Sequence, residues 1–122
     1  HYINYKGKLE TDIRLKVMSK YDFFISASIS EGLPITLIEC MAIGLPFITT
    51  KVGAVEDLLI DNYPYVSNSD SESIMLTINK ALRDLIQNRI FIDNLINSNN
   101  NLFQIKFKYE NYFNCIKKIL DE

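Results

Sequence analysis

The sequence has few of the features that mark membrane, secreted or nucleic-acid-binding proteins. Its longest apolar runs fall short of the roughly 18 residues that a membrane span needs, and its first ten residues lack the apolar segment of a signal peptide. A net charge of −2 argues against general nucleic-acid binding, because such proteins usually carry a basic excess. What is present is a chain of 122 residues, 48% of them hydrophobic, which is enough for one domain with a sizeable core.

Cysteine and histidine are equally scarce. The two cysteines, Cys40 and Cys115, lie too far apart for a metal-binding spacing. We interpret them as reduced structural thiols of a cytoplasmic protein. The single histidine, His1, receives no role. Because the chain does not begin with methionine, we expect it to be a fragment of a longer protein.

Short apolar runs alternate with helical patterns in the first half of the chain. Four runs predict strands: Tyr2–Tyr5, Asp22–Ala27, Pro46–Thr50 and Tyr63–Ser67. The second and third of them are continuously apolar or β-branched, which is typical of strands covered on both faces. Helices are predicted between them over Thr11–Lys20, Pro34–Ile43 and Val55–Ile60. Strands alternating with helices predict the α/β class, as a partial Rossmann-like parallel sheet of about four strands with flanking helices.

The second half of the chain predicts a helical C-terminal tail. Ser69 and Glu72 form a capping-box pattern, with Ser69 as the N-cap of a helix. The apolar face of that helix comprises Ile74, Ile78, Ala81, Leu82 and Leu85. A second helix is predicted from Phe91, Ile92 and Leu95, followed by a polar break at Asn97–Asn101. The last amphipathic stripe comprises Tyr109, Phe113, Ile116 and Leu120.

This order of elements suggests the latter part of a doubly wound domain, because no strand follows the first tail helix. Ligands of such domains bind outside the carboxyl ends of the strands. In this chain those ends lead into Ser28–Pro34 and Lys51–Val55, where we expect the ligand.

The helix predicted over Pro34–Ile43 carries the most informative chemistry. Pro34 suits its first position, and Gly44 followed by Pro46 suits its end. The helix is apolar nearly all round, which predicts burial, yet Thr36 and Glu39 share one face. A buried, unpaired carboxylate is unfavourable unless its face meets water or a ligand rich in hydrogen-bond donors, such as a sugar.

The start of the same helix predicts an anion site. Its first backbone N–H groups, at Ile35–Leu37, lack helical acceptors, and the positive end of the helix dipole favours phosphate. An acid for hydroxyls beside a helix end for phosphate suits a nucleotide sugar. A structural interpretation stays open on spacing alone: Glu39 pairs with Lys51 or another base, and Glu31 is a solvated loop residue.

Residues 29–59 read "ISEGLPITLIECMAIGLPFITTKVGAVEDLL". This stretch resembles the signature of retaining nucleotide-sugar glycosyltransferases of the GT-B fold, in particular glycosyltransferase family 4. In that signature, as between Glu31 and Glu39 here, seven residues separate two glutamates. Other matching positions are Gly32, Pro34, Leu37, Met41, Ala42, Gly44 and Pro46. The resemblance covers Tyr2–Val66 well and the helical tail loosely.

The resemblance implies roles for both glutamates. Glu39 would accept hydrogen bonds from the ribose hydroxyls of the donor. Glu31, as the catalytic residue, would contact the transferred sugar and stabilise positive charge at its anomeric carbon.

The resemblance also implies that backbone groups bind the donor. The N–H groups of Gly32 and Leu33 would contact sugar hydroxyls, and those after Pro34, at Ile35 and Thr36, would hold the diphosphate of a UDP- or GDP-linked sugar. The family generally needs no metal, no DxD motif is present, and we expect no cofactor.

Several parts of the family's pattern differ or are missing. Cys40 replaces the usual alanine, and Ala54 replaces a common glycine, which could shift donor choice. The family's phosphate-binding Arg and Lys and its acceptor-binding N-terminal domain would lie upstream. We therefore expect residues 1–122 to be an N-terminally truncated C-terminal nucleotide-sugar-binding domain, inactive alone.

The whole protein would transfer a sugar, with retention, to a sugar or lipid-linked acceptor in polysaccharide or glycolipid synthesis. The resemblance implies a cytoplasmic protein, with peripheral association at the inner face of the membrane allowed. Two alternatives stay open: another GT-B enzyme such as a nucleotide-sugar epimerase, and a non-catalytic module whose terminal stripe binds a partner.

Overall fold

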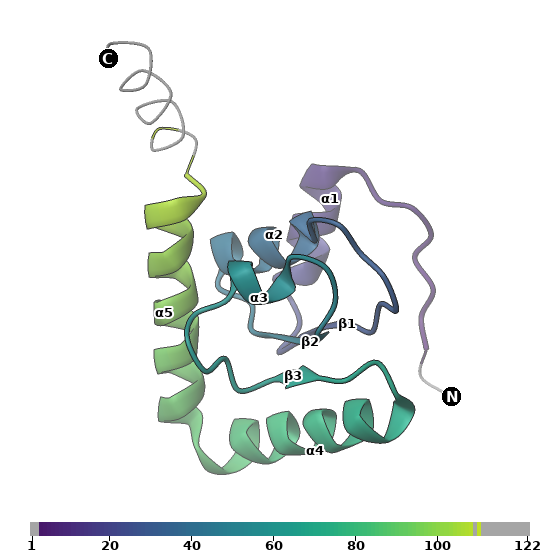
Figure 1. Cartoon of the computed structure of the whole chain (residues 1–122). Helices are drawn as coiled ribbons and strands as arrows, with labels where there is room; N and C mark the ends of the chain where they lie inside the picture. The colour runs from purple at the N-terminus through teal and green to yellow at the C-terminus, as the bar shows by residue number, and fades with distance from the viewer. Residues whose placement is uncertain (1–2, 109, 111–122) are drawn as a thin grey trace.

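The computed structural model describes residues 3–108 and residue 110 (Figure 1). Its elements, in order, are α1 (Thr11–Met18), β1 (Phe24–Ser26), α2 (Ile35–Ile43), β2 (Phe47–Thr50), α3 (Val55–Leu58), β3 (Val66–Ser67), α4 (Ser71–Gln87) and α5 (Arg89–Lys106). The strands form one parallel sheet in the order β1-β2-β3. The predicted α/β class is confirmed.

The helices lie on both sides of this small sheet. Figure 1 shows α1, α2 and α3 on one side and α4 on the other. Helix α5 runs along the side of the molecule and packs against both α2 and α4. In the part of the chain that the structure describes, no helix is long and apolar enough to cross a membrane.

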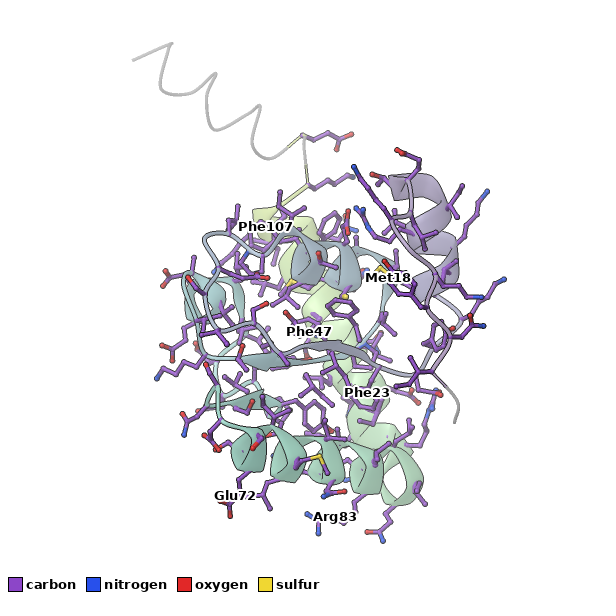
Figure 2. The ribbon with its side chains drawn as sticks, turned by 90° about the vertical axis from the view of Figure 1, so that its right-hand side faces the viewer. Met18, Phe23, Phe47, Glu72, Arg83 and Phe107 are labelled. Atoms are coloured by element: carbon purple, nitrogen blue, oxygen red, sulfur yellow. The ribbon has the colours of Figure 1, made fainter. Side chains whose placement is uncertain are left out.

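The strand β2 forms the centre of the core, as its apolar sequence predicts. All four of its residues are buried, and Figure 2 shows Phe47 in the middle of the molecule. Strand β1 differs, because Ile25 is 47% exposed. Within the described residues β1 pairs only with β2, so it lies at an edge of the sheet. The expectation that both faces of this strand are covered is wrong.

The predicted first strand, Tyr2–Tyr5, is also wrong where the structure describes it. Ile3 and Tyr5 are 96% and 90% exposed and form no ladder. A strand exists only when a neighbour accepts its backbone hydrogen bonds, and residues 3–5 have none. The described sheet therefore has three strands instead of about four.

The strand predicted over Tyr63–Ser67 is shortened by the Tyr63 side chain. The Tyr63 hydroxyl accepts from Phe47 N at 3.1 Å and donates to Phe47 O at 2.8 Å, and the two rings stack with centroids 4.7 Å apart. This hydroxyl replaces the backbone partner that a longer β3 would give Phe47. Burial raises the pKa of Tyr63, so the hydroxyl stays protonated and can donate.

We expect Tyr63→Phe to lower the free energy of unfolding by about 2 kcal/mol, because two buried backbone groups of Phe47 lose their partner. Denaturant unfolding of the intact protein measures the change. Tyr21→Phe, the same change on a ring that is 58% exposed, is the matched control and should be neutral. Equal stabilities of the two variants would contradict this role.

The N-cap of α4 lies one residue later than predicted. Asp70, not Ser69, is the N-cap, and its Oδ1 accepts from Ser73 N at 2.8 Å. The helix buries Ala81 as expected, but Leu82 is 48% exposed. Glu72 and Arg83 lie on the outer side of α4 (Figure 2).

The polar run Asn97–Asn101 does not break the tail, because α5 continues through it. Asn100 Nδ2 donates to the carbonyls of Met41 (3.2 Å) and Ala42 (3.3 Å) at the end of α2. Hydrogen bonds to α2 therefore satisfy the Asn100 side chain, which the sequence pattern places in a loop. The predicted stripe of Tyr109, Phe113, Ile116 and Leu120 lies outside the described residues, as does Cys115.

Candidate functional site

The two segments expected to bind a ligand, Ser28–Pro34 and Lys51–Val55, meet at the carboxyl ends of β1 and β2. Thr50 Oγ1 donates to the Ser28 carbonyl at 2.6 Å. The Ala54 amide donates to the Gly32 carbonyl at 3.1 Å. The two segments therefore lie side by side, and these hydrogen bonds hold them together.

Gly53 makes this close approach possible. Its φ of +54° lies in the left-handed region, and a Cβ there would lie 1.9 Å from the Glu31 carbonyl oxygen. Any larger residue would push the two segments apart. The sequence analysis assigns no structural role to Gly53, although a glycine three residues after a buried strand is a signal of a tight loop.

The carboxylate of Glu31 is half-buried and oriented by its own loop. Ser28 Oγ donates to Glu31 Oε1 at 2.8 Å, while Thr50 holds the Ser28 carbonyl. The loop is thus hydrogen-bonded to Thr50 of β2 near its start and to the Ala54 amide at its middle. Glu31 is not the freely solvated loop residue of the structural interpretation.

Helix α2 begins at Ile35, one residue later than predicted, with Pro34 as its N-cap. No side chain caps this end, and the first turn carries no acidic residue, so the positive end of the helix dipole is not neutralised locally. The amides of Ile35 and Leu37 already donate to Leu33 O (2.9 Å) and Pro34 O (3.0 Å). The expectation of free amides is therefore wrong at Ile35 and Leu37, the residues on either side of Thr36.

Helix α2 is buried on one side only. Leu37, Cys40 and Met41 face the core, whereas Ile35 is 62% exposed. The expected burial all round is therefore wrong at the start of the helix. Burial raises the pKa of the Cys40 thiol to about 12, with a smaller contribution from the Glu39 charge, which fits the predicted reduced structural thiol.

Glu39 is paired with a base, and the base is Arg14 of α1. The Arg14 guanidinium donates twice, from Nη2 to Oε1 (2.5 Å) and from Nε to Oε2 (3.3 Å). Lys51, the partner considered from the sequence, instead pairs with Glu56 at 2.9 Å. No sequence pattern points to Arg14 as the partner, because the contact joins residues 25 positions apart.

The fold and this loop-and-helix site fit one family of transferases. Residues 2–98 match the family described as Glycosyl transferases group 1, and the chain belongs to that family. A similar curated sequence is an uncharacterized glycosyltransferase from Methanocaldococcus jannaschii, 26% identical over 124 residues. The match covers 99% of this chain and 34% of the relative, so the chain spans about a third of the relative's length.

Proposed function

We propose that this chain forms part of the donor site of a retaining, family 4-like glycosyltransferase of the GT-B fold. The observation that carries the proposal is the arrangement of Glu31 and Glu39 around the uncapped start of α2. Membership of the glycosyl transferases group 1 family supports it.

Each part of the proposed donor has a matching group. The N-terminal end of α2, at Thr36 and beside Ile35, offers positive potential to the diphosphate. The Glu39 carboxylate would accept the ribose hydroxyls. The backbone N–H groups of Gly32 and Leu33, both exposed residues, would contact the transferred sugar.

Glu31 is the proposed catalytic residue. During transfer the bond between the anomeric carbon and the diphosphate breaks, and the acceptor oxygen bonds to the same carbon from the leaving-group face. The acceptor proton passes to the departing diphosphate. Glu31, held by Ser28, would stabilise the positive charge on the anomeric carbon while the first bond is broken and the second incomplete.

The rest of the activity lies outside these residues in the proposal. Residues 1–122 would be the C-terminal nucleotide-sugar-binding domain of a longer cytoplasmic protein. An N-terminal domain would bind a sugar or lipid-linked acceptor, at the inner face of the membrane in the lipid case. The donor would be UDP- or GDP-linked, without a metal or other cofactor.

We expect Glu39→Gln in the intact protein to weaken UDP or GDP binding about tenfold, because an amide is a poorer acceptor for two hydroxyls than a carboxylate. Isothermal titration calorimetry measures the affinity. The melting temperature should fall by no more than about 5 °C, because glutamine still offers Arg14 an acceptor oxygen and the pair is only partly buried. Glu72→Gln on the outer side of α4 is the matched control.

The opposite pattern would contradict the proposal. If Glu39→Gln unfolded the protein and left nucleotide affinity unchanged, Glu39 would be a structural partner of Arg14 only. If the wild-type protein bound neither UDP nor GDP, the proposal that this chain forms part of a donor site would itself be contradicted.

A further inference from the structure

The ion pair between Arg14 and Glu39 leaves part of the carboxylate available. The contact has two points, Nη2 with Oε1 and Nε with Oε2, so each oxygen accepts one hydrogen bond from Arg14. A carboxylate has about four acceptor positions, two on each oxygen. One position on each oxygen is therefore left, which suits two neighbouring hydroxyl groups.

The pair lies where a ligand can reach it. The Glu39 side chain is 16% exposed and that of Arg14 is 35% exposed. Glu39 occupies the face of α2 that it shares with Thr36, one turn from the uncapped helix start. The remaining acceptor positions are thus close to the proposed diphosphate position without being buried in the core.

The pair also fixes what the carboxylate can do. The hydrogen bond that Arg14 donates to Glu39 raises the pKa of Arg14, so the guanidinium is charged at any physiological pH. A carboxylate held in a two-point contact with a guanidinium cannot rotate freely about its last bond. It therefore presents its remaining acceptors in one orientation before any ligand arrives.

We infer that Arg14 is a positioning residue, which orients the Glu39 carboxylate to accept both hydroxyls of a ribose. This role rests on the proposed function, because it requires a ribonucleotide at Glu39. It predicts selectivity for ribonucleotides over analogues that lack both hydroxyls, and it places part of that selectivity on α1, outside the motif around α2.

The test compares UDP and GDP with their 2′,3′-dideoxy forms by calorimetry on the intact protein. Arg14→Met approximately keeps the length of the side chain and removes both its charge and the two N–H donors that contact Glu39. Arg14→Lys keeps the charge and removes the guanidinium. Lys16→Met, an exposed lysine of the same helix, is the matched control.

The wild-type protein and Lys16→Met should prefer one ribonucleotide over its dideoxy form by at least about tenfold. Arg14→Met should lose most of that preference through weaker binding of the ribonucleotide, with dideoxy binding unchanged. Arg14→Lys should recover part of the preference. With an acceptor present, donor KM should rise in Arg14→Met while kcat changes less than about threefold, the pattern of lost uniform binding.

Three results would overturn the role. An unchanged preference in Arg14→Met would show that the ion pair is purely structural. Tighter ribonucleotide binding by Arg14→Met would show that Arg14 blocks the site and that the ligand must displace it. If Arg14→Met does not fold, an unchanged preference in Arg14→Lys would be decisive instead. Failure of the proposed function is distinguishable, because the wild-type protein would then bind neither nucleotide or show no preference.

Discussion

Replacing Glu31 by glutamine in the intact protein should lower kcat by about 100-fold, the effect typical of removing one preorganised electrostatic group from a site of developing charge. Glutamine keeps the size of the side chain and can still accept from Ser28 Oγ, so the loop should stay in place. Donor KM should change little, because the charge of Glu31 matters most when the anomeric carbon is most positive. Initial rates of sugar transfer to an acceptor measure both constants.

Two further variants make this result specific. Glu72→Gln removes the same charge from the outer side of α4 and should leave kcat unchanged. Ser28→Ala removes the hydrogen bond that orients Glu31 and should lower kcat less, by about tenfold. A Glu31→Gln enzyme with normal kcat would show that Glu31 does not act on the reacting sugar.

The second large effect is expected at Gly53. Gly53→Ala should lower the free energy of unfolding by about 3 kcal/mol, because its Cβ would lie 1.9 Å from the Glu31 carbonyl oxygen and its φ of +54° is strained for alanine. The displaced Glu31 loop should also bind nucleotide more weakly. Denaturant unfolding and calorimetry measure the two effects.

The matched control is Gly32→Ala in the facing segment. A Cβ at Gly32 would meet nothing within 4 Å, and its φ is not in the left-handed region, so stability should stay within about 0.5 kcal/mol of wild type. Equal stabilities for the two alanine variants would mean that the segments separate without cost, contrary to the described contact.

The elements that the sequence predicted well are those fixed by local chemistry. Strand β2 follows from a run of apolar and β-branched residues, and α2 ends at Gly44, whose φ of +71° suits glycine. The wrong predictions concern segments whose structure depends on contacts with residues distant in the sequence. The polar run in α5 continues as helix because Asn100 finds carbonyls on α2, and residues 3–5 form no strand because they have no neighbour.

The candidate site shows the same division. The spacing of Glu31 and Glu39 is read directly from the sequence, and the order of strands and helices predicts that Ser28–Pro34 and Lys51–Val55 lie at the carboxyl ends of the strands. Arg14 could not, because nothing in a helix pattern says which distant carboxylate a guanidinium reaches. Helix rules predict free amides at Ile35 and Leu37 because they describe a helix end without the loop that precedes it, whereas here Leu33 and Pro34 accept from both amides.

The hydrogen bonds of Asn100 have a practical consequence for where this domain can be cut. The family match ends at residue 98, inside α5, whereas Asn100 holds the last carbonyls of α2 from just beyond that point. The N-terminal end of α2 carries the proposed diphosphate position. Its C-terminal end would lose the hydrogen bonds from Asn100. A shortened protein ending at the similarity boundary would contain every motif residue and still lack one anchor of the helix that presents them.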